Sequence, residues 1–230
     1  MAKEHLVKSF DEELEKLNAW IGQMGGLAEA QLSGALDAIS QRDASIAERV
    51  IASDAQIDKL ERDVAQHVIR MLALRQPMAV DLRAIVAALK ISGVIERIGD
   101  YAANLAKRSL VLGQMPPMRS IGGLERLGRL VVGVLKDVLD AFGQSDVKKA
   151  RQVWLRDAEV DDMYTSLFRE LLTYMMEDPR NITPCTHLLF MAKNIERIGD
   201  HATNIAENTW FLVHGESLPA ERLKGDLTSQ

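Results

Sequence analysis

Hydrophobic residues recur every three or four positions along most of this chain, with charged residues between them. That spacing is typical of amphipathic α-helices. Proline and glycine interrupt it at a few places, most strongly at Gly113-Gln-Met-Pro-Pro117. We find no convincing strand pattern. The periodicity and its breaks predict six helices, over about residues 6–40, 43–74, 77–112, 121–143, 146–177 and 184–213.

Local residues refine these boundaries. Met24-Gly25-Gly26 predicts a kink in the first helix, and the second has a possible break near Ser53. Ser145 or Asp146 is suited to cap the fifth helix. Thr183-Pro184 predicts an N-cap followed by a first helical residue, so the sixth helix is expected to begin there.

An eleven-residue segment occurs twice. Glu96-Arg-Ile-Gly-Asp-Tyr-Ala-Ala-Asn-Leu-Ala106 returns as Glu196-Arg-Ile-Gly-Asp-His-Ala-Thr-Asn-Ile-Ala206, with eight of eleven positions identical. The flanking helices repeat in the same order. We therefore expect an all-α fold of two tandem, pseudo-symmetric three-helix bundles, over residues 1–115 and 116–216, followed by a polar tail over 217–230.

Each repeat carries a polar face. Residues four apart lie on one side of a helix, so the four-residue spacing that both copies share lines up two carboxylates and an amide. The preceding helix of each half adds further carboxylates with the same spacing. The candidate metal ligands are Asp54, Asp58, Glu96, Asp100 and Asn104 in the first half, and Asp157, Asp161, Glu196, Asp200 and Asn204 in the second.

Two interpretations of these faces stay open. They are either solvated surfaces with salt bridges, or sites where carboxylates from two helices hold a hard or borderline metal ion. Gly99 and Gly199 fit a close approach by either a metal cluster or another helix. Lys107 stands where the second half has Glu207, so we expect the second face to bind cations better.

Composition excludes several classes of protein. The formal net charge of −5 shows no basic surplus, so we expect no nucleic-acid partner. One cysteine excludes an internal disulfide, and no apolar segment is long enough for a signal peptide or a membrane span, so a cytoplasmic protein is expected. Phosphate-binding loops, Glu-x-x-His pairs and nucleophile motifs are missing from the sequence, and catalytic machinery is not expected.

The chain resembles the PhoU family, the accessory and regulatory proteins of the bacterial high-affinity phosphate transport system. The resemblance rests on Leu74-Arg-Gln-Pro-Met-Ala-Val-Asp-Leu-Arg83 and on the two repeated segments, and it covers about residues 5–216. The second half has Asn181-Ile-Thr183 where the first has Asp81-Leu-Arg83, so the role of that tripeptide belongs to one half.

The resemblance implies iron or another divalent metal on the acidic faces, with Fe, Zn, Mn, Mg and Ni not distinguishable, and no organic cofactor. It implies the transporter's ATPase subunit and a sensor histidine kinase as partners, a homodimer, and contact with the membrane only through partners. The leading hypothesis is a non-enzymatic negative regulator of phosphate uptake and of the phosphate-starvation response. The alternatives are a carboxylate-ligated metalloenzyme acting on phosphate esters, and a helical scaffold without metal.

Overall fold

The computed structural model describes residues 2–75, 77–117 and 121–219, with side chains from residue 10 onward. The predicted tail lies outside the described residues from position 220 onward. Helices make up nearly all of the described chain. Its elements are α1 (Ala2–Gln41), α2 (Ala44–Arg75), α3 (Ala79–Gly113), α4 (Ile121–Gly143), α5 (Val147–Leu155), α6 (Asp157–Glu177), the 3₁₀ turn η1 (Pro179–Asn181) and α7 (Ile182–His214).

Two of the helix starts are capped by equivalent aspartates. The Asp43 carboxylate accepts from the backbone N–H of Ser45 at 2.8 Å, at the start of α2. The Asp146 carboxylate accepts from the N–H of Lys148 at 3.0 Å, at the start of α5. Each bond satisfies a donor that has no partner inside its helix. Of the two caps offered by the sequence for the fifth helix, Asp146 is therefore the correct one.

Three of the predicted helix boundaries are wrong. The second helix is continuous at the expected break near Ser53, whereas the first is a single element through Gly25 and the kink expected there stays a prediction. The fifth predicted helix is instead divided at Arg156, which stands at the position equivalent to Ser53. The last helix begins at Ile182 rather than behind a Thr183 cap, because the turn η1 continues directly into it.

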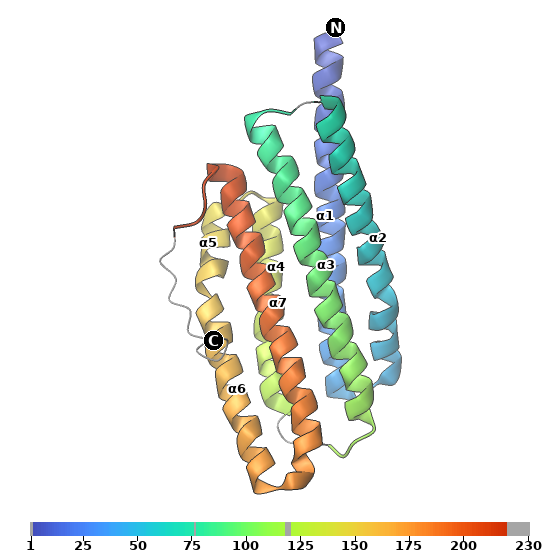
Figure 1. The fold of residues 1–230 in the computed structure, drawn as a ribbon, viewed down its shortest axis with the longest axis vertical. Coiled ribbons are helices and arrows are strands. Elements are labelled where there is room, and N and C mark those ends of the chain that lie inside the picture. The colour runs from blue at the N-terminus through green and yellow to red at the C-terminus, as the bar shows by residue number, and fades with distance from the viewer. Residues whose placement is uncertain (1, 76, 118–120, 220–230) are drawn as a thin grey trace.

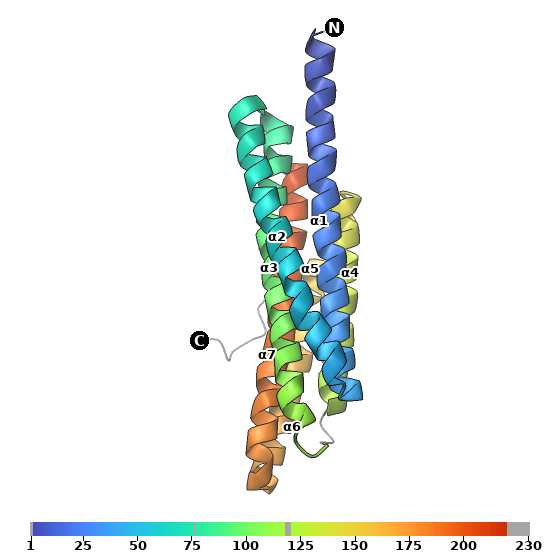
Figure 2. The same ribbon diagram turned by 90° about the vertical axis from the view of Figure 1, so that its right-hand side faces the viewer.

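The long helices form two antiparallel three-helix bundles that lie side by side (Figure 1). One bundle contains α1, α2 and α3, and the other contains α4, the α5–α6 pair and α7. Helices α3 and α7 pack against each other along the middle of the molecule, and α1 packs against α4 (Figures 1 and 2). In both contacts the two helices run in opposite directions, as they do when a two-fold axis that runs across the helices relates the halves.

Reciprocal glycine–leucine contacts join α1 to α4. A Cβ on Gly25 would lie 2.7 Å from Leu139 Cδ2, and a Cβ on Gly128 would lie 2.7 Å from Leu36 Cδ1. The two glycines are 103 residues apart in sequence, and so are the two leucines. The same contact is therefore made twice, once in each direction, across the boundary between the bundles.

One hydrophobic core runs through both bundles. Leu17, Ile57 and Ile95 from the first half and Leu135 and Leu188 from the second belong to a single cluster of buried residues. The two repeats therefore share one hydrophobic core and are not separate domains with cores of their own. No helix in the described part of the chain is both long and apolar enough to cross a membrane.

Candidate functional site

The two copies of the repeated segment meet where α3 crosses α7. The ring of Tyr101 stacks on that of its counterpart His201, with centroids 5.6 Å apart and an interplanar angle of 24°. The Arg197 guanidinium donates to the Tyr101 hydroxyl at 3.2 Å. Burial lowers the pKa of His201, and Arg97 and Arg197 lower it further, although Asp200 opposes them. The two polar faces therefore flank a common centre.

In the first half, the structure brings four predicted carboxylates from α2 and α3 together. Burial raises the pKa of Asp54, and the charges of Asp58 and Asp100 raise it further. Burial also raises the pKa of Glu96, with added repulsion from Asp100, Asp58 and Glu61. One carboxylate raises the pKa of another only where the two lie near each other. These four residues form the first acidic face, and Glu61 lies beside them.

In the second half, the acidic face is more deeply buried. The exposed fractions of Asp157, Asp161 and Glu196 are 3%, 7% and 3%, whereas the counterparts Asp54 and Asp58 are half-buried. The Thr203 hydroxyl donates to the Asp157 carboxylate at 2.9 Å. Burial raises the pKa of Glu196, and Asp200 and Asp161 raise it further, while a hydrogen bond from Lys193 opposes the shift.

The two amides lie one helical turn beyond the acids. Asn104 is exposed one turn after Asp100, and Asn204 is half-buried one turn after Asp200. The backbone carbonyl of Asn204 accepts a hydrogen bond from the Asn208 amide at 2.7 Å. Both amides therefore sit at the rim of their acidic faces, with the carboxylates as the inner donors.

Lysines lie at both acidic faces, so Lys107 alone does not determine the difference in charge between the two faces. Lys107 does lower the pKa of Asp54, so it lies near the first face. In the second half, however, the Lys193 ammonium pairs with Glu196 at 2.8 Å, where the first half has Gly93. The Glu207 carboxylate accepts from the Trp154 indole at 3.1 Å. The charge difference predicted between the two faces is thus offset by a residue that the sequence analysis did not consider.

Gly99 and Gly199 are explained by helix packing. A Cβ on Gly99 would lie 3.0 Å from Ile57 Cδ1 on α2 and 3.3 Å from the Asp54 carboxylate. A Cβ on Gly199 would lie 3.1 Å from Val160 on α6. The close approach at both glycines is therefore that of the neighbouring helix, and it is this approach that brings the acids of the two helices together.

The donor set fits an oxygen-preferring cation. Each face offers four carboxylates, and the Glu196 Oε2 atom is buried without a hydrogen-bond partner among the described residues. Within the same residues, no three His, Cys, Asp or Glu side chains already stand in a ligating arrangement. At the second face Lys193 pairs with Glu196 Oε1, so Oε2 is the oxygen of Glu196 that is left as a donor for a cation.

Comparison with known proteins identifies the fold and the repeat. The model of the PhoU domain matches residues 21–109 and again residues 124–209. The chain belongs to the PhoU family. A "Phosphate-specific transport system accessory protein PhoU homolog" from Caulobacter vibrioides is 54% identical over 99% of both chains. The "Phosphate-specific transport system accessory protein PhoU" of Edwardsiella tarda is 38% identical, over 92% of this chain and 87% of that protein.

Solved PhoU structures have the same architecture. The crystal structure of PhoU from Pseudomonas aeruginosa superposes with a TM-score of 0.88 and 39% identity, over 90% of this chain and 100% of that one. The "phosphate transport system regulatory protein PhoU" of Streptococcus pneumoniae gives a TM-score of 0.84 and 30% identity, over 91% and 99% of the two chains. The predicted all-α fold is confirmed. The chain is an accessory and regulatory protein of phosphate transport and not an enzyme, so the metalloenzyme alternative is set aside.

Proposed function

We propose that the chain is a negative regulator of phosphate uptake and of the phosphate-starvation response. It acts in the cytoplasm, as a homodimer, by contacting the ATPase subunit of the phosphate ABC transporter and a sensor histidine kinase. The membership of a family of phosphate transport accessory proteins carries this proposal. The two acidic faces support a role for metal ions in it, because paired helices hold clustered carboxylates with raised pKa values on both sides of one shared centre.

A phosphate-starvation reporter tests the regulatory role. Deletion of the gene should leave the reporter active in phosphate-rich medium, and the wild-type gene should restore repression. If metal at the second face is required, Glu196→Ala/Asp200→Ala should fail to restore it. Asp162→Ala is the matched control, because this exposed carboxylate on α6 lies next to Asp161 in sequence but is not one of the inner donors. Unchanged reporter output in the deletion strain would remove the regulatory assignment.

The metal proposal has its own test. We propose that Asp54, Asp58, Glu96 and Asp100, with Asp157, Asp161, Glu196 and Asp200, hold divalent or iron-type cations, with Asn104 and Asn204 at the rim. Carboxylates must lose their protons to bind metal, so affinity should fall as pH drops through about 5. Elemental analysis of protein purified without chelator should find bound transition metal. Affinity that stayed flat between about pH 7 and 4.5 would contradict carboxylate ligation.

A further inference from the structure

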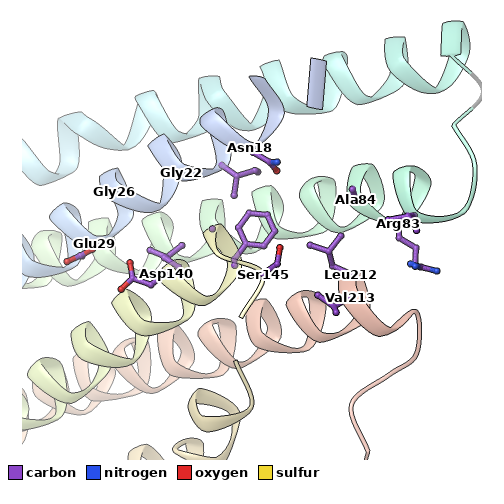
Figure 3. A pocket seen from close by; sticks show the side chains of 15 residues that line it. Asn18, Gly22, Gly26, Glu29, Arg83, Ala84, Asp140, Ser145, Leu212 and Val213 are labelled. Atoms are coloured by element: carbon purple, nitrogen blue, oxygen red, sulfur yellow. The ribbon is translucent and has the colours of Figure 1, made fainter. Parts of the chain in front are cut away.

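A groove of about 760 Å³ opens beside α1 (Figure 3), and its lining includes no residue of the two acidic faces. Helix α1 forms one wall, the end of α4 and the turn into α5 form another, and the ends of α3 and α7 complete it. Leu139, Phe142, Leu212 and Val213 give the groove an apolar lining. On α1 the lining includes Gly22 and Gly26, both exposed, one helical turn apart.

The two-fold relation between the halves supplies a second, smaller groove for comparison. Its volume is about 260 Å³, and it lies at the other end of the α1–α4 contact. Leu36 and Asp37 line it where Leu139 and Asp140 line the larger groove, each pair 103 residues apart. The two grooves are therefore built from equivalent positions of the repeat.

Side chains fill the smaller groove at the positions where the larger one has glycines. Glu125 is the counterpart of Gly22, and Arg129 is the counterpart of Gly26. Glu125 and Arg129, one turn apart on α4, form an ion pair at 3.6 Å, and both side chains line the smaller groove. A Cβ on Gly22 or Gly26 would meet no atom of the protein within 4 Å. Packing inside the chain thus does not require glycine at either position.

Glycine in the middle of a helix nevertheless has a cost. It lowers helix stability by about 1 kcal/mol relative to alanine. The glycines Gly25 and Gly34 on the same helix are explained by internal contacts, with Leu139 and Val50. Gly22 and Gly26 have no such explanation inside the chain. They leave a flat strip of α1 backbone, which a second helix can approach closely.

The ends of the larger groove carry opposite charges (Figure 3). Glu29 and Asp140 lie at one end, where Lys149 neutralises part of the charge by pairing with Asp140 at 3.0 Å. Arg83 lies at the other end, half-buried, and its Nε atom has no hydrogen-bond partner among the described residues. A helix bound along the groove would place its positive N-terminal end by the carboxylates and its negative C-terminal end by Arg83.

We propose that this groove binds an amphipathic helix of the transporter's ATPase subunit. About two turns of an α-helix fit the volume of the groove. The helix would present an apolar face, basic residues near its start and an acidic residue near its end. The assignment of the ATPase rests on the proposed function, because the relatives are named for the transport system. In this proposal Arg83 contacts the C-terminal end of the bound helix. The second half has Thr183 at the equivalent position and does not share that role.

The chain itself suggests the test variant. Gly22→Glu/Gly26→Arg copies the ion pair of the smaller groove and should fill the larger one without disturbing the fold. Gly133→Arg is the control, because that glycine also lies within a helix, is uncrowded and lines neither groove. Binding to the purified ATPase subunit from the same genome is measured by titration calorimetry. We expect affinity to fall at least about tenfold in the double variant and to stay within about twofold in the control.

Each outcome has one meaning. Equal affinity of wild type and Gly22→Glu/Gly26→Arg would overturn the groove proposal and leave the proposed regulatory function standing. If the double variant lost binding to the cytoplasmic part of the kinase and kept the ATPase, the assigned occupant would be wrong. If the wild-type protein bound no ATPase subunit at all, both the groove proposal and the transporter contact in the proposed function would fall. A second variant, Glu29→Lys, reverses a charge at one end of the groove and leaves Gly22 and Gly26 unchanged. It should also weaken ATPase binding.

Discussion

The reciprocal contacts between α1 and α4 predict that a single methyl group at Gly128 destabilises the protein. Its Cβ would lie 2.7 Å from Leu36 Cδ1 and 3.1 Å from Leu36 Cγ, so the leucine must move. Overpacking of this kind costs about 1–3 kcal/mol. Replacing glycine by alanine within a helix returns about 1 kcal/mol. We therefore expect Gly128→Ala to lower the free energy of unfolding by about 1 kcal/mol.

Two further variants isolate the contact. Gly133→Ala, in the same helix with no atom within 4 Å, should raise the free energy of unfolding by about 1 kcal/mol. In a Leu36→Ala background the obstruction is gone, so Gly128→Ala should also become stabilising. Urea unfolding followed by circular dichroism is measured for the wild type, Gly128→Ala, Gly133→Ala, Leu36→Ala and Leu36→Ala/Gly128→Ala. The reasoning would be refuted if Gly128→Ala were as stable as Gly133→Ala, or if its deficit persisted without Leu36.

Three other predictions concern the stability of the folded protein. Thr203→Val removes the hydrogen bond to the buried Asp157 carboxylate and should cost about 1.5–3 kcal/mol in urea unfolding. Asp146→Ala removes the cap of α5 and should cost about 1 kcal/mol, measurable as a fall of about 2–4 °C in Tm. Burial and repulsion by Asp100 raise the pKa of Glu96, so the folded state binds its proton more tightly than the unfolded state does. The ionised form therefore destabilises the metal-free protein at pH 7. Glu96→Gln should be more stable there, and its advantage should vanish as pH falls below the unfolded pKa of about 4.3.

The sequence was sufficient to predict the fold because its signals are local. Apolar periodicity gave the long helices, and the repeated segment gave the two halves. The break in the fifth helix was not predictable in this way. Arg156 binds Asp137 of α4 at 2.9 Å, and that partner lies nineteen residues away in another helix. At the equivalent Ser53, the hydroxyl bonds instead to the Val50 carbonyl of its own helix, and α2 continues.

The acidic faces were predictable in outline for the same reason. Spacing of four residues is enough to place Glu96 beside Asp100, and the repeat indicates that both faces exist. Contacts from other helices were not visible in the spacing. The Gln31 amide, from α1, partly opposes the rise in the pKa of Asp54 that burial causes, and no pattern in the sequence connects these two residues. Lys193, by contrast, stands three positions before Glu196, so its ion pair could have been found from the spacing.

The contacts between the halves suggest what duplication makes possible. Gly25 with Leu139, Gly128 with Leu36, and Tyr101 with His201 each repeat or pair equivalent positions. Two identical copies of one repeat could make the same contacts as a symmetric dimer. In such a dimer, however, a tyrosine on the axis would face a tyrosine, and both α1–α4 grooves would be alike. A single chain removes that constraint. It can stack tyrosine on histidine at the centre, and it can fill one groove with an ion pair while glycines keep the other open.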